Sequence, residues 1–255
     1  MSAIFEQFTL HGKVAIITGA SRGIGEAFAR AFAQAGAQVM LSSRKAETLE
    51  PLVAELRAAG HQADYFAAHA GDVDAMHASA AHTVKTFGRI DIVVNNAATS
   101  PVFGPVEQTT PDVFDKIMAV NLKGPFELCK AAYPELSRNQ GCVLNIASIG
   151  GISPEPFMGI YNVSKSALIG LTKVLAREWG SSGVRVNALC PGLVQTKLSQ
   201  ALWTNEPLME QVLGQQPLQF MAQPLDMAGM ALMLCSPAGR YCTGGVYVND
   251  GGYTI

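Results

Sequence analysis

Short apolar runs rich in valine and isoleucine alternate along this chain with longer stretches of helical periodicity. This alternation constrains the fold most, because strands that alternate with helices build βαβ units and a parallel sheet. The runs are almost continuously apolar, so we expect helices to cover both faces of that sheet. The predicted strands occupy residues 13–18, 37–42, 90–95, 142–147, 184–189 and 245–250, with a further strand region ahead of His69.

Helical patterns fill the segments between these runs. The chain has 255 residues, of which 49% are hydrophobic, so it can bury one large core. We predict a single domain over residues 1–255, a doubly wound (Rossmann) α/β fold with a parallel sheet of about seven strands, which binds ligands outside the carboxyl ends of its strands. The expected helices lie near 23–35, 45–59, 73–87, 111–137, 161–180 and 225–235, and a more irregular stretch spans about 193–223.

Charge and composition narrow the choice of partners. The formal net charge is -2 and the basic residues form no cluster, so neither nucleic acid nor an anionic membrane surface is an expected partner. The N-terminal residues do not resemble a signal peptide and no apolar run is long enough to span a bilayer, which favours a cytoplasmic location. The five cysteines and five histidines show no metal-ligand spacing, so we predict buried thiols and no metal site.

A glycine-rich turn follows the first predicted strand and opens a helical pattern. It reads TGASRGIG over residues 18–25, with GxxxGxG spacing. Glycines at such a turn let backbone amides approach a pyrophosphate, whose charge is favoured at a helix N-terminus. A purely structural turn is the alternative. The candidate cofactor-binding residues of this segment are Gly19, Ser21, Arg22, Gly23, Ile24 and Gly25.

The end of the second strand indicates which dinucleotide binds. An acidic residue there would accept hydrogen bonds from a ribose 2′-hydroxyl, but the chain reads Ser-Ser-Arg-Lys over residues 42–45. The Arg44 guanidinium and the Ser43 hydroxyl can hold a 2′-phosphate, with Arg22 reaching across from the glycine-rich turn. We therefore predict NADP(H) as the cofactor. The alternative is that Arg44 and its neighbour only solvate the start of a helix.

Tyr161 and Lys165 lie four residues apart in a strong helical pattern, so their side chains share one helix face. A nearby ammonium favours the ionised form of a phenol, which makes the pair suited to acid-base work. Ser148 ends the predicted strand 142–147, at the edge where ligands bind, and its hydroxyl can donate a hydrogen bond to a carbonyl oxygen. The Tyr-Lys spacing alone is weak, because a structural tyrosine with a solvated lysine produces it too.

Six ordered motifs together resemble the short-chain dehydrogenase/reductase family over nearly the whole chain. They are TGASRGIG at 18–25, NNAA at 95–98, VNLKG at 120–124, Ser148 thirteen residues before Tyr161, YNVSK at 161–165 and CPGLVQT at 190–196. The resemblance implies that Tyr161 donates the proton, Lys165 lowers its pKa and holds the nicotinamide ribose, Ser148 orients the carbonyl and Asn121 anchors a water. Asn95 and Ala97 would line the cofactor, with Pro191, Gly192, Val194 and Thr196 on the nicotinamide side, although Asn95 could instead pair groups between strands and Pro191-Gly192 could merely form a turn.

Two positions depart from the family pattern. His69, followed by Ala70 in AAHAGD, stands where an acidic residue usually faces the adenine, and Ala97-Ala98 replaces the commoner Ala-Gly beside the cofactor. Neither change removes a catalytic group. An adenine contact and a structural role are equally open for His69. The pattern looks similar to the NADPH-dependent carbonyl and retinal reductase branch of the family.

Residues 193–223 look like a substrate lid. Their apolar side chains recur at roughly helical spacing, which favours an apolar carbonyl substrate, a ketone or an aldehyde, and mobile closure. The same side chains could instead close the core or pack on a neighbouring subunit, and the resemblance implies a homotetramer or homodimer. The set consists of Leu198, Leu202, Trp203, Leu208, Met209, Val212 and Leu213.

Two rival functions remain open at this point. A 3-oxoacyl-(acyl carrier protein) reductase resembles this chain, but such enzymes usually carry basic residues that dock an acidic carrier protein, and the corresponding stretches offer only Arg138 and Arg185. A non-catalytic NADP(H)-binding sensor or scaffold would keep the glycine-rich turn and lose the acid, whereas all four catalytic residues are present here. The sequence therefore favours an NADP(H)-dependent carbonyl reductase.

Overall fold

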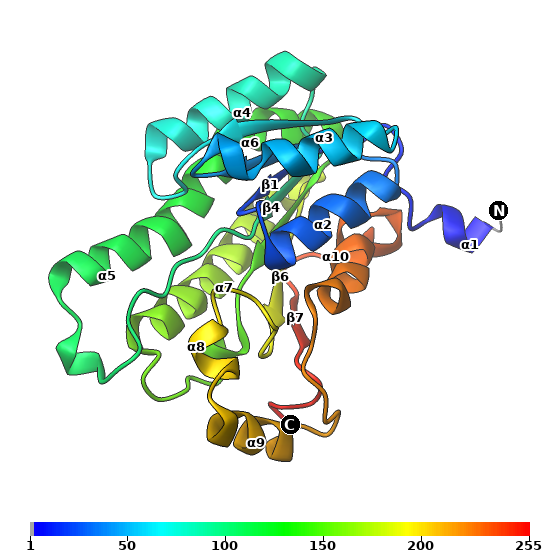
Figure 1. Ribbon diagram of the computed structural model, residues 1–255. Coiled ribbons are helices and arrows are strands. Elements are labelled where there is room, and N and C mark those ends of the chain that lie inside the picture. Colours follow the sequence, from blue (N-terminus) through cyan, green and yellow to red (C-terminus); the bar gives the residue numbers. More distant parts are fainter. Residues whose placement is uncertain (1–2) are drawn as a thin grey trace.

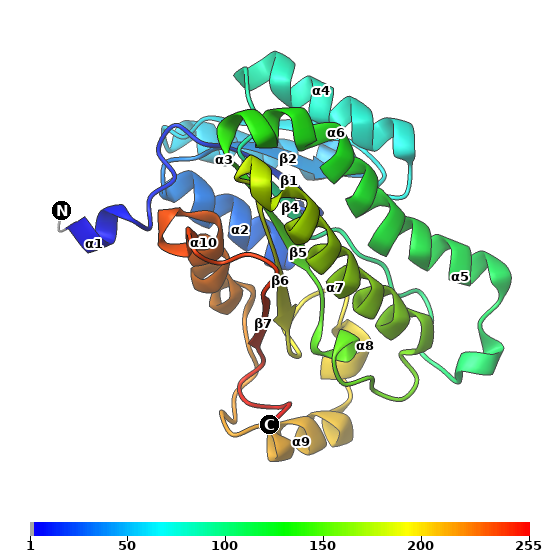
Figure 2. The same ribbon diagram turned by 180° about the vertical axis from the view of Figure 1, so that it is seen from behind.

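Every predicted strand forms, and the strand ahead of His69 completes a seven-stranded parallel sheet. The computed structural model describes residues 3–255 (Figures 1 and 2). The strand order is β3-β2-β1-β4-β5-β6-β7 and each neighbouring pair is parallel, which confirms the doubly wound α/β prediction. The strands are β1 (Val14–Thr18), β2 (Gln38–Ser43), β3 (Ala63–Ala67), β4 (Ile92–Asn95), β5 (Cys142–Ile146), β6 (Arg185–Pro191) and β7 (Val246–Asn249).

Helices follow the predicted segments with shifted ends. The expected helix over 111–137 is broken by a five-residue π-helical turn, and the irregular stretch after β6 contains two short helices that lie below the sheet in the view of Figure 1. The helices are α1 (Ala3–Glu6), α2 (Gly23–Gln34), α3 (Glu50–Ala58), α4 (Val73–Phe87), α5 (Pro111–Met118), η3 (Ala119–Lys123, π-helical), α6 (Gly124–Asn139), α7 (Gly159–Trp179), α8 (Gln200–Trp203), α9 (Glu206–Gln215) and α10 (Ala228–Cys235).

The side chains of the strands are buried on both faces of the sheet. Ile17 of β1 packs in the layer of α2, α3 and α10, whereas its neighbour Ile16 packs in the layer of α4, α6 and α7. Successive residues of a strand point to opposite faces, so a strand covered on both sides must be apolar throughout. This requirement explains the continuous apolar runs of the sequence and leaves the carboxyl ends of the strands as the open edge of the sheet.

Two further sequence predictions concern membrane-spanning segments and the cysteine thiols. No helix within residues 3–255 is both long and apolar enough to cross a bilayer. All five cysteines are free thiols; four are buried and Cys242 is half-buried. The prediction of buried thiols is therefore confirmed for Cys129, Cys142, Cys190 and Cys235.

Candidate active site

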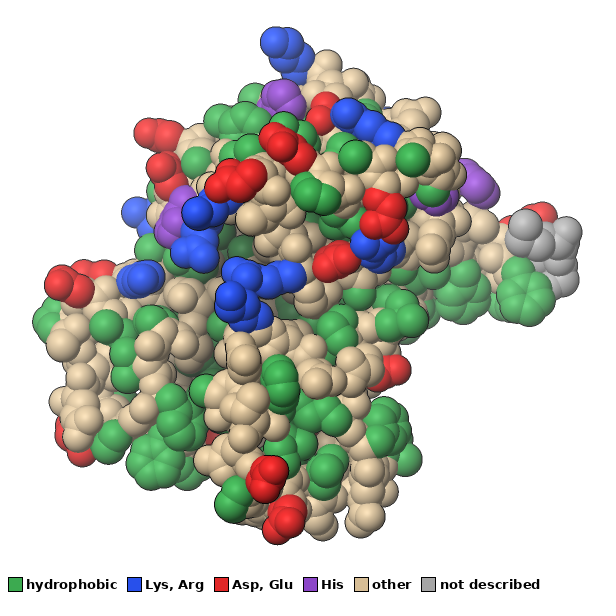
Figure 3. All heavy atoms as spheres, viewed as in Figure 1, with side chains coloured by type: hydrophobic (Ala, Val, Ile, Leu, Met, Phe, Trp, Pro, Cys, Tyr) green, Lys and Arg blue, Asp and Glu red, His purple; other side chains and the backbone are tan. Residues whose placement is uncertain are grey.

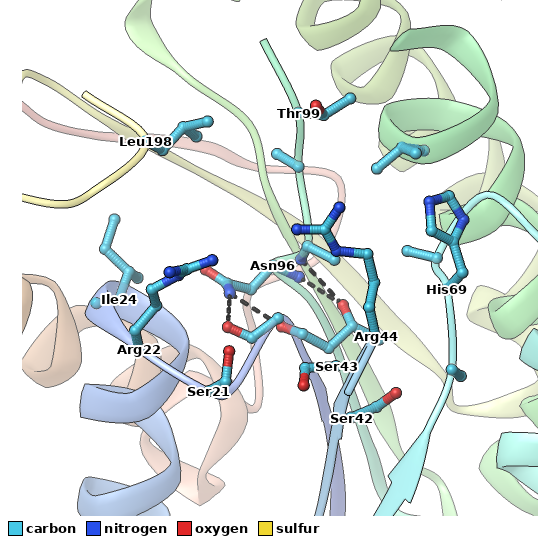
Figure 4. A pocket seen from close by; sticks show the side chains of 18 of the residues that line it. Ser21, Arg22, Ile24, Ser42, Ser43, Arg44, His69, Asn96, Thr99 and Leu198 are labelled. Carbon is cyan, nitrogen blue, oxygen red and sulfur yellow. Dashed lines mark hydrogen bonds between the residues drawn. The ribbon is translucent and has the colours of Figure 1, made fainter. Parts of the chain in front are cut away.

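A cavity opens at the carboxyl edge of the sheet, where the strand order reverses between β1 and β4 (Figure 4). Its walls come from the ends of β1, β2, β3 and β4 and from the segment after β6. Such a switch point separates two neighbouring loops and leaves a crevice between them. The lining residues include Thr18, Gly19, Ser43, Arg44, His69, Asn96, Thr99 and Thr196. The fold therefore places the predicted turn, the predicted cations and the end of β6 around one cavity.

The glycine-rich turn brings backbone into the floor of this cavity. Gly19 has a φ of +66°, and a Cβ there would lie 2.9 Å from Cα of Ala97. Helix α2 starts at Gly23, and Arg22 before it makes no capping hydrogen bond with its side chain. The first amides of a helix have no partner within the helix, so those of α2 can bind an anion.

Eleven of the sixteen predicted cofactor-binding residues line the cavity. Figure 4 shows Arg22 and Arg44 extending their guanidinium groups from opposite sides, with His69 on the wall next to Arg44. The His69 Nδ1 accepts a hydrogen bond from the Gly71 amide at 3.1 Å. The eleven are Gly19, Ser21, Arg22, Gly23, Ile24, Ser43, Arg44, His69, Ala70, Ala97 and Thr196.

The other five predicted residues are not among those that line the cavity. Asn95 is 2% exposed, and its side-chain amide donates to Oδ1 of Asn145 on β5 at 2.8 Å, the pairing between strands that was the alternative for this residue. A Cβ on Gly25 would lie 2.4 Å from the Gly19 carbonyl oxygen, so this glycine lets α2 pack against the turn. Pro191, Gly192 and Val194 also lie outside the lining.

Asn96, which was not predicted as a site residue, ties the two strand ends at the switch point together. Its side-chain amide donates to the Thr18 carbonyl at 2.9 Å, and its backbone amide donates to the Thr18 hydroxyl at 3.0 Å. β4 ends at Asn95, so the next residue turns out of the sheet into the cavity wall. The NNAA motif could have indicated Asn96 as a site residue, but it does not show which of the two asparagines faces the cavity. Further unpredicted lining residues are Thr18, Ser42, Ala68, Met76, Ala98, Thr99, Lys116, Val120 and Lys197. Leu198 of the predicted lid also lines the cavity.

Tyr161 and Lys165 occupy one face of α7, as their spacing predicts. The Lys165 ammonium lies 5.6 Å from the centroid of the Tyr161 ring and donates a hydrogen bond to the Ile146 carbonyl at the end of β5, at 2.7 Å. The side chain of Lys165 is buried, and burial lowers its pKa to about 8. A titratable cation is therefore held next to a phenol at the open edge of the sheet.

Ser148 follows β5 and brings its hydroxyl to the same place. Its side chain caps a short turn by accepting a hydrogen bond from the Gly150 amide at 3.1 Å. Burial raises the pKa of Tyr161 to about 12, and the neighbouring Ser148 hydroxyl acts in the opposite direction. The family resemblance implies that Lys165 lowers this pKa, but burial outweighs the lowering effects within the protein. The phenol is consequently protonated at neutral pH and can act as an acid.

Asn121 lies in the π-helical turn η3 and is fully buried. Its side-chain oxygen accepts a hydrogen bond from the Thr99 amide at 2.8 Å, and its amide group donates to the Thr99 carbonyl and to the Ser164 hydroxyl, each at 3.0 Å. Four residues later stands Pro125, which has no amide hydrogen to give to the Asn121 carbonyl in an α-helix. The backbone carbonyl of Asn121 thus lacks its ordinary helical donor and is available to another hydrogen-bond donor. Single π-helical turns are often found at functional sites.

These hydrogen bonds connect the cavity to α7. Thr99 lines the cavity, Asn121 holds Thr99, and Ser164 links Asn121 to the Tyr161 carbonyl with a hydrogen bond of 2.7 Å. The four predicted catalytic residues lie outside the lining of the cavity itself. Asn121 therefore fixes the distance between the cavity wall and the helix that carries Tyr161 and Lys165.

The predicted lid consists of α8 and α9 with their flanking loops. Trp203 at the end of α8 donates from its indole nitrogen to the Thr196 carbonyl at 2.8 Å, and the Thr196 hydroxyl lies 2.9 Å from the Ser199 hydroxyl. Leu198 lines the cavity and is 50% exposed. The remaining members of the predicted apolar set are half-buried. The first helix of this segment is thus fastened to a residue of the cavity wall.

Comparison with known proteins gives matches over almost the whole chain. Residues 19–254 match the family model described as enoyl-(acyl carrier protein) reductase. The dehydrogenase/reductase SDR family member 4 of Sus scrofa is 41% identical over 244 residues, which cover 95% of this chain and 88% of the relative.

Two solved structures are similar in shape as well as in sequence. A gluconate 5-dehydrogenase from Burkholderia cenocepacia J2315, in complex with NADP and tartrate, is 30% identical with a TM-score of 0.95 and covers 98% of each chain. A 7α-hydroxysteroid dehydrogenase in complex with NADH and 7-oxoglycochenodeoxycholic acid is 32% identical with a TM-score of 0.93, over 97% of this chain and 96% of the other.

Proposed function

This chain belongs to the short-chain dehydrogenase/reductase family of oxidoreductases, and on that premise we propose that it transfers hydride between NADP(H) and a ketone or aldehyde. The observation that carries the proposal is the cluster of Ser148, Tyr161 and Lys165 at the carboxyl edge of the sheet, next to the cavity that can hold a dinucleotide. In the reverse direction the substrate is a secondary or primary alcohol.

The cavity fits a phosphorylated dinucleotide. A Cβ at Gly19 would collide with the backbone of Ala97, so only glycine lets the turn pack against the residues after β4, beside the open amides of α2 that can bind a pyrophosphate. Arg22 and Arg44 present two guanidinium groups, and Ser43 adds a hydroxyl, where a 2′-phosphate would lie. The two solved relatives bind NADP and NADH respectively, so the choice of NADP(H) rests on these residues of this chain.

Each catalytic residue has one task in the proposed mechanism. When bound, the nicotinamide would supply the hydride for the carbonyl carbon. Ser148 donates a hydrogen bond to the carbonyl oxygen and orients it, and the protonated Tyr161 gives its proton to that oxygen. Lys165 contributes the positive charge that favours the tyrosinate left behind. We assign the replacement proton to a water held by the backbone carbonyl of Asn121, the group that Pro125 leaves without a helical donor.

The substrate site lies between the loop after Ser148 and the predicted lid over residues 193–223. The half-buried apolar side chains of α8 and α9 support an apolar carbonyl substrate and closure over it. Assembly as a homotetramer or homodimer and a cytoplasmic location remain predictions from the sequence.

The structure weakens the rival carrier-protein function. Arg138 pairs with Glu135, and the Arg185 guanidinium donates to the carbonyls of Leu234 and Gly239 at 2.7 and 2.8 Å. Arg185 is thus committed to holding the loop before β7, and the two arginines offer no shared docking surface for an acidic partner. A non-catalytic sensor would not need the ordered contacts around Tyr161, so we rank it last.

A two-part measurement tests the proposal. We expect Tyr161→Phe to abolish NADPH-dependent reduction of diketones and aryl ketones while the dissociation constant of NADPH stays within about twofold, because the phenol gives a proton and does not hold the nucleotide. Fluorescence titration should show NADPH binding at least about tenfold tighter than NADH, a gap of about 1.4 kcal/mol. Undiminished turnover in the variant would refute the mechanism, and equal dissociation constants would refute the cofactor assignment. Acyl thioesters in the same screen separate the carrier-protein rival.

A further inference from the structure

Two lysines of the cavity have no role in the proposed function. Lys116 on α5 and Lys197, which follows Thr196, line the same cavity as Arg22 and Arg44. Four cations from four separate segments therefore face one cavity, and its lining within residues 3–255 contains no aspartate or glutamate. The space-filling view shows Lys and Arg side chains gathered over the middle of this face (Figure 3).

The charge of these four side chains is not balanced by the protein. In residues 3–255 none of them forms an ion pair, whereas the adjacent Lys45 lies 3.6 Å from Glu47. Like charges that converge on a cavity without counter-charges repel one another and attract an anion. NADP(H) carries its negative charge on two separate groups, the pyrophosphate and the 2′-phosphate, so the cations can be divided between them.

Lys197 stands at the pyrophosphate end of the cavity. A Cβ on Gly23 would lie 3.3 Å from Cγ2 of Thr196, so the segment that carries Lys197 lies against the first turn of α2. The amides of that turn are free of side-chain capping. Lys197, which follows Thr196, can therefore contact an anion bound at the first turn of α2. An ammonium group forms strong hydrogen bonds with phosphate oxygens.

Lys116 stands at the other end. It lies one helical turn before Val120, and a Cβ on Gly71 would lie 3.1 Å both from Cγ2 of Val120 and from Cε1 of His69. This turn of the helix therefore faces the wall that carries His69. Figure 4 shows the Arg44 side chain between Asn96 and His69, at the same end of the cavity.

We propose that Lys197 is a pyrophosphate-binding residue that contributes equally to NADPH and NADH, and that Lys116 joins Arg44 in selecting the 2′-phosphate. The inference rests on the proposed NADP(H)-dependent function. The two lysines thus have different effects on cofactor specificity. Lys197 raises the affinity for NADPH and NADH equally, and Lys116 raises the affinity for NADPH alone.

Isothermal titration of NADP⁺ and NAD⁺ into single variants tests this division. Lys197→Met is expected to weaken both by about fivefold, the scale of one exposed charge-assisted contact, and Lys197→Arg to restore most of the loss. Lys116→Met is expected to weaken NADP⁺ by about fivefold and NAD⁺ by less than about twofold. Lys45→Met, next to Arg44 but outside the cavity lining, is the matched control and should change neither.

Two fragments separate the phosphate groups. ADP contains the pyrophosphate without a 2′-phosphate, and 2′-AMP contains the 2′-phosphate without a pyrophosphate. Displacement of bound NADPH, followed by its fluorescence, should show that Lys197→Met weakens ADP and spares 2′-AMP, and that Lys116→Met does the reverse. If Lys197→Met binds ADP as tightly as wild type, or if it weakens only the binding of 2′-AMP, Lys197 is not a pyrophosphate-binding residue. Wild-type protein that binds neither NADP⁺ nor ADP would instead overturn the proposed function, and thermal unfolding checks that each variant is folded.

Discussion

Replacing Lys165 with methionine should stabilise the folded protein while it destroys the reaction. The lysine is 2% exposed, and burial lowers its pKa from 10.5 to about 8. A buried ammonium that loses its proton this easily is unfavourable in the folded state. Methionine keeps most of the aliphatic stem and removes the charge, so the variant loses the cost of burying that charge and keeps the packing.

The magnitude follows from the difference between the two pKa values. A shift of one unit corresponds to about 1.36 kcal/mol, so the buried charge costs about 3 kcal/mol at pH 7. The variant also loses the 2.7 Å hydrogen bond from Lys165 to the Ile146 carbonyl, worth about 1 kcal/mol. The net gain is about 2 kcal/mol, or a rise in Tm of about 4 to 8 °C for a domain of this size.

The pH dependence has a definite sign. The unfolded chain binds the lysine proton with a pKa near 10.5 and the folded chain with a pKa of about 8. At higher pH both states are neutral and the lysine carries no penalty; as the pH falls from about 10.5 to about 8 the unfolded chain takes up the proton first and unfolding is favoured. Below about pH 8 the penalty is complete. The advantage of Lys165→Met should therefore be about 2 kcal/mol at pH 7 and nearly vanish at about pH 9.5.

Urea and thermal unfolding of the nucleotide-free proteins, run in parallel at the two pH values, measure this difference. Lys173→Met, an exposed position two turns further along α7, is the matched control and should change stability by less than about 0.5 kcal/mol at either pH. Ketone reduction by Lys165→Met should fall by at least about 100-fold. A variant that is less stable than wild type at pH 7, or a stability difference that does not change with pH, would show that the ammonium is not buried as described.

Two further substitutions test the helix break and the glycine-rich turn. Pro125→Ala supplies an amide hydrogen to the Asn121 carbonyl, so turnover should fall by about tenfold while NADPH affinity stays within about twofold; unchanged turnover in a steady-state assay would remove this carbonyl from the mechanism. Gly25→Ala places a Cβ 2.4 Å from the Gly19 carbonyl and should cost about 2 kcal/mol or more and abolish NADPH binding, whereas Gly170→Ala, in open space on α7, should raise Tm slightly. Equal melting temperatures for these two glycine variants would contradict the packing at the turn.

Local sequence pattern was enough to predict the helix that carries Tyr161 and Lys165 and most of the glycine-rich turn. A separation of four residues places Tyr161 and Lys165 on one face of any α-helix, whatever the rest of the fold does. The strand ends could be located from the apolar runs, so Ser148 and Arg44 could be assigned to the open edge of a parallel sheet. The same signals could not show that the helix over 111–137 contains a π-helical turn, because a proline marks a break in a helix without showing the form of that break.

The sequence could not show in which direction a side chain points at the end of a strand. Asn95 and Asn96 are chemically identical neighbours, and only the position at which β4 ends decides that the first pairs with Asn145 inside the sheet and the second lines the cavity. Arg185 presented the same difficulty. It was a candidate for docking a partner, and the fold instead turns its guanidinium inward to backbone carbonyls.

The sequence by itself determined a doubly wound sheet, a glycine-rich turn and the shared helix face of Tyr161 and Lys165, because periodicity and spacing act over a few residues. Only the tertiary structure decided which groups share the cavity. Lys116 and Lys197 are far apart in the sequence and line one cavity because α5 and the segment after β6 both border it. The protonation of Tyr161 and Lys165 was likewise decided by burial, which depends on every segment packed around them.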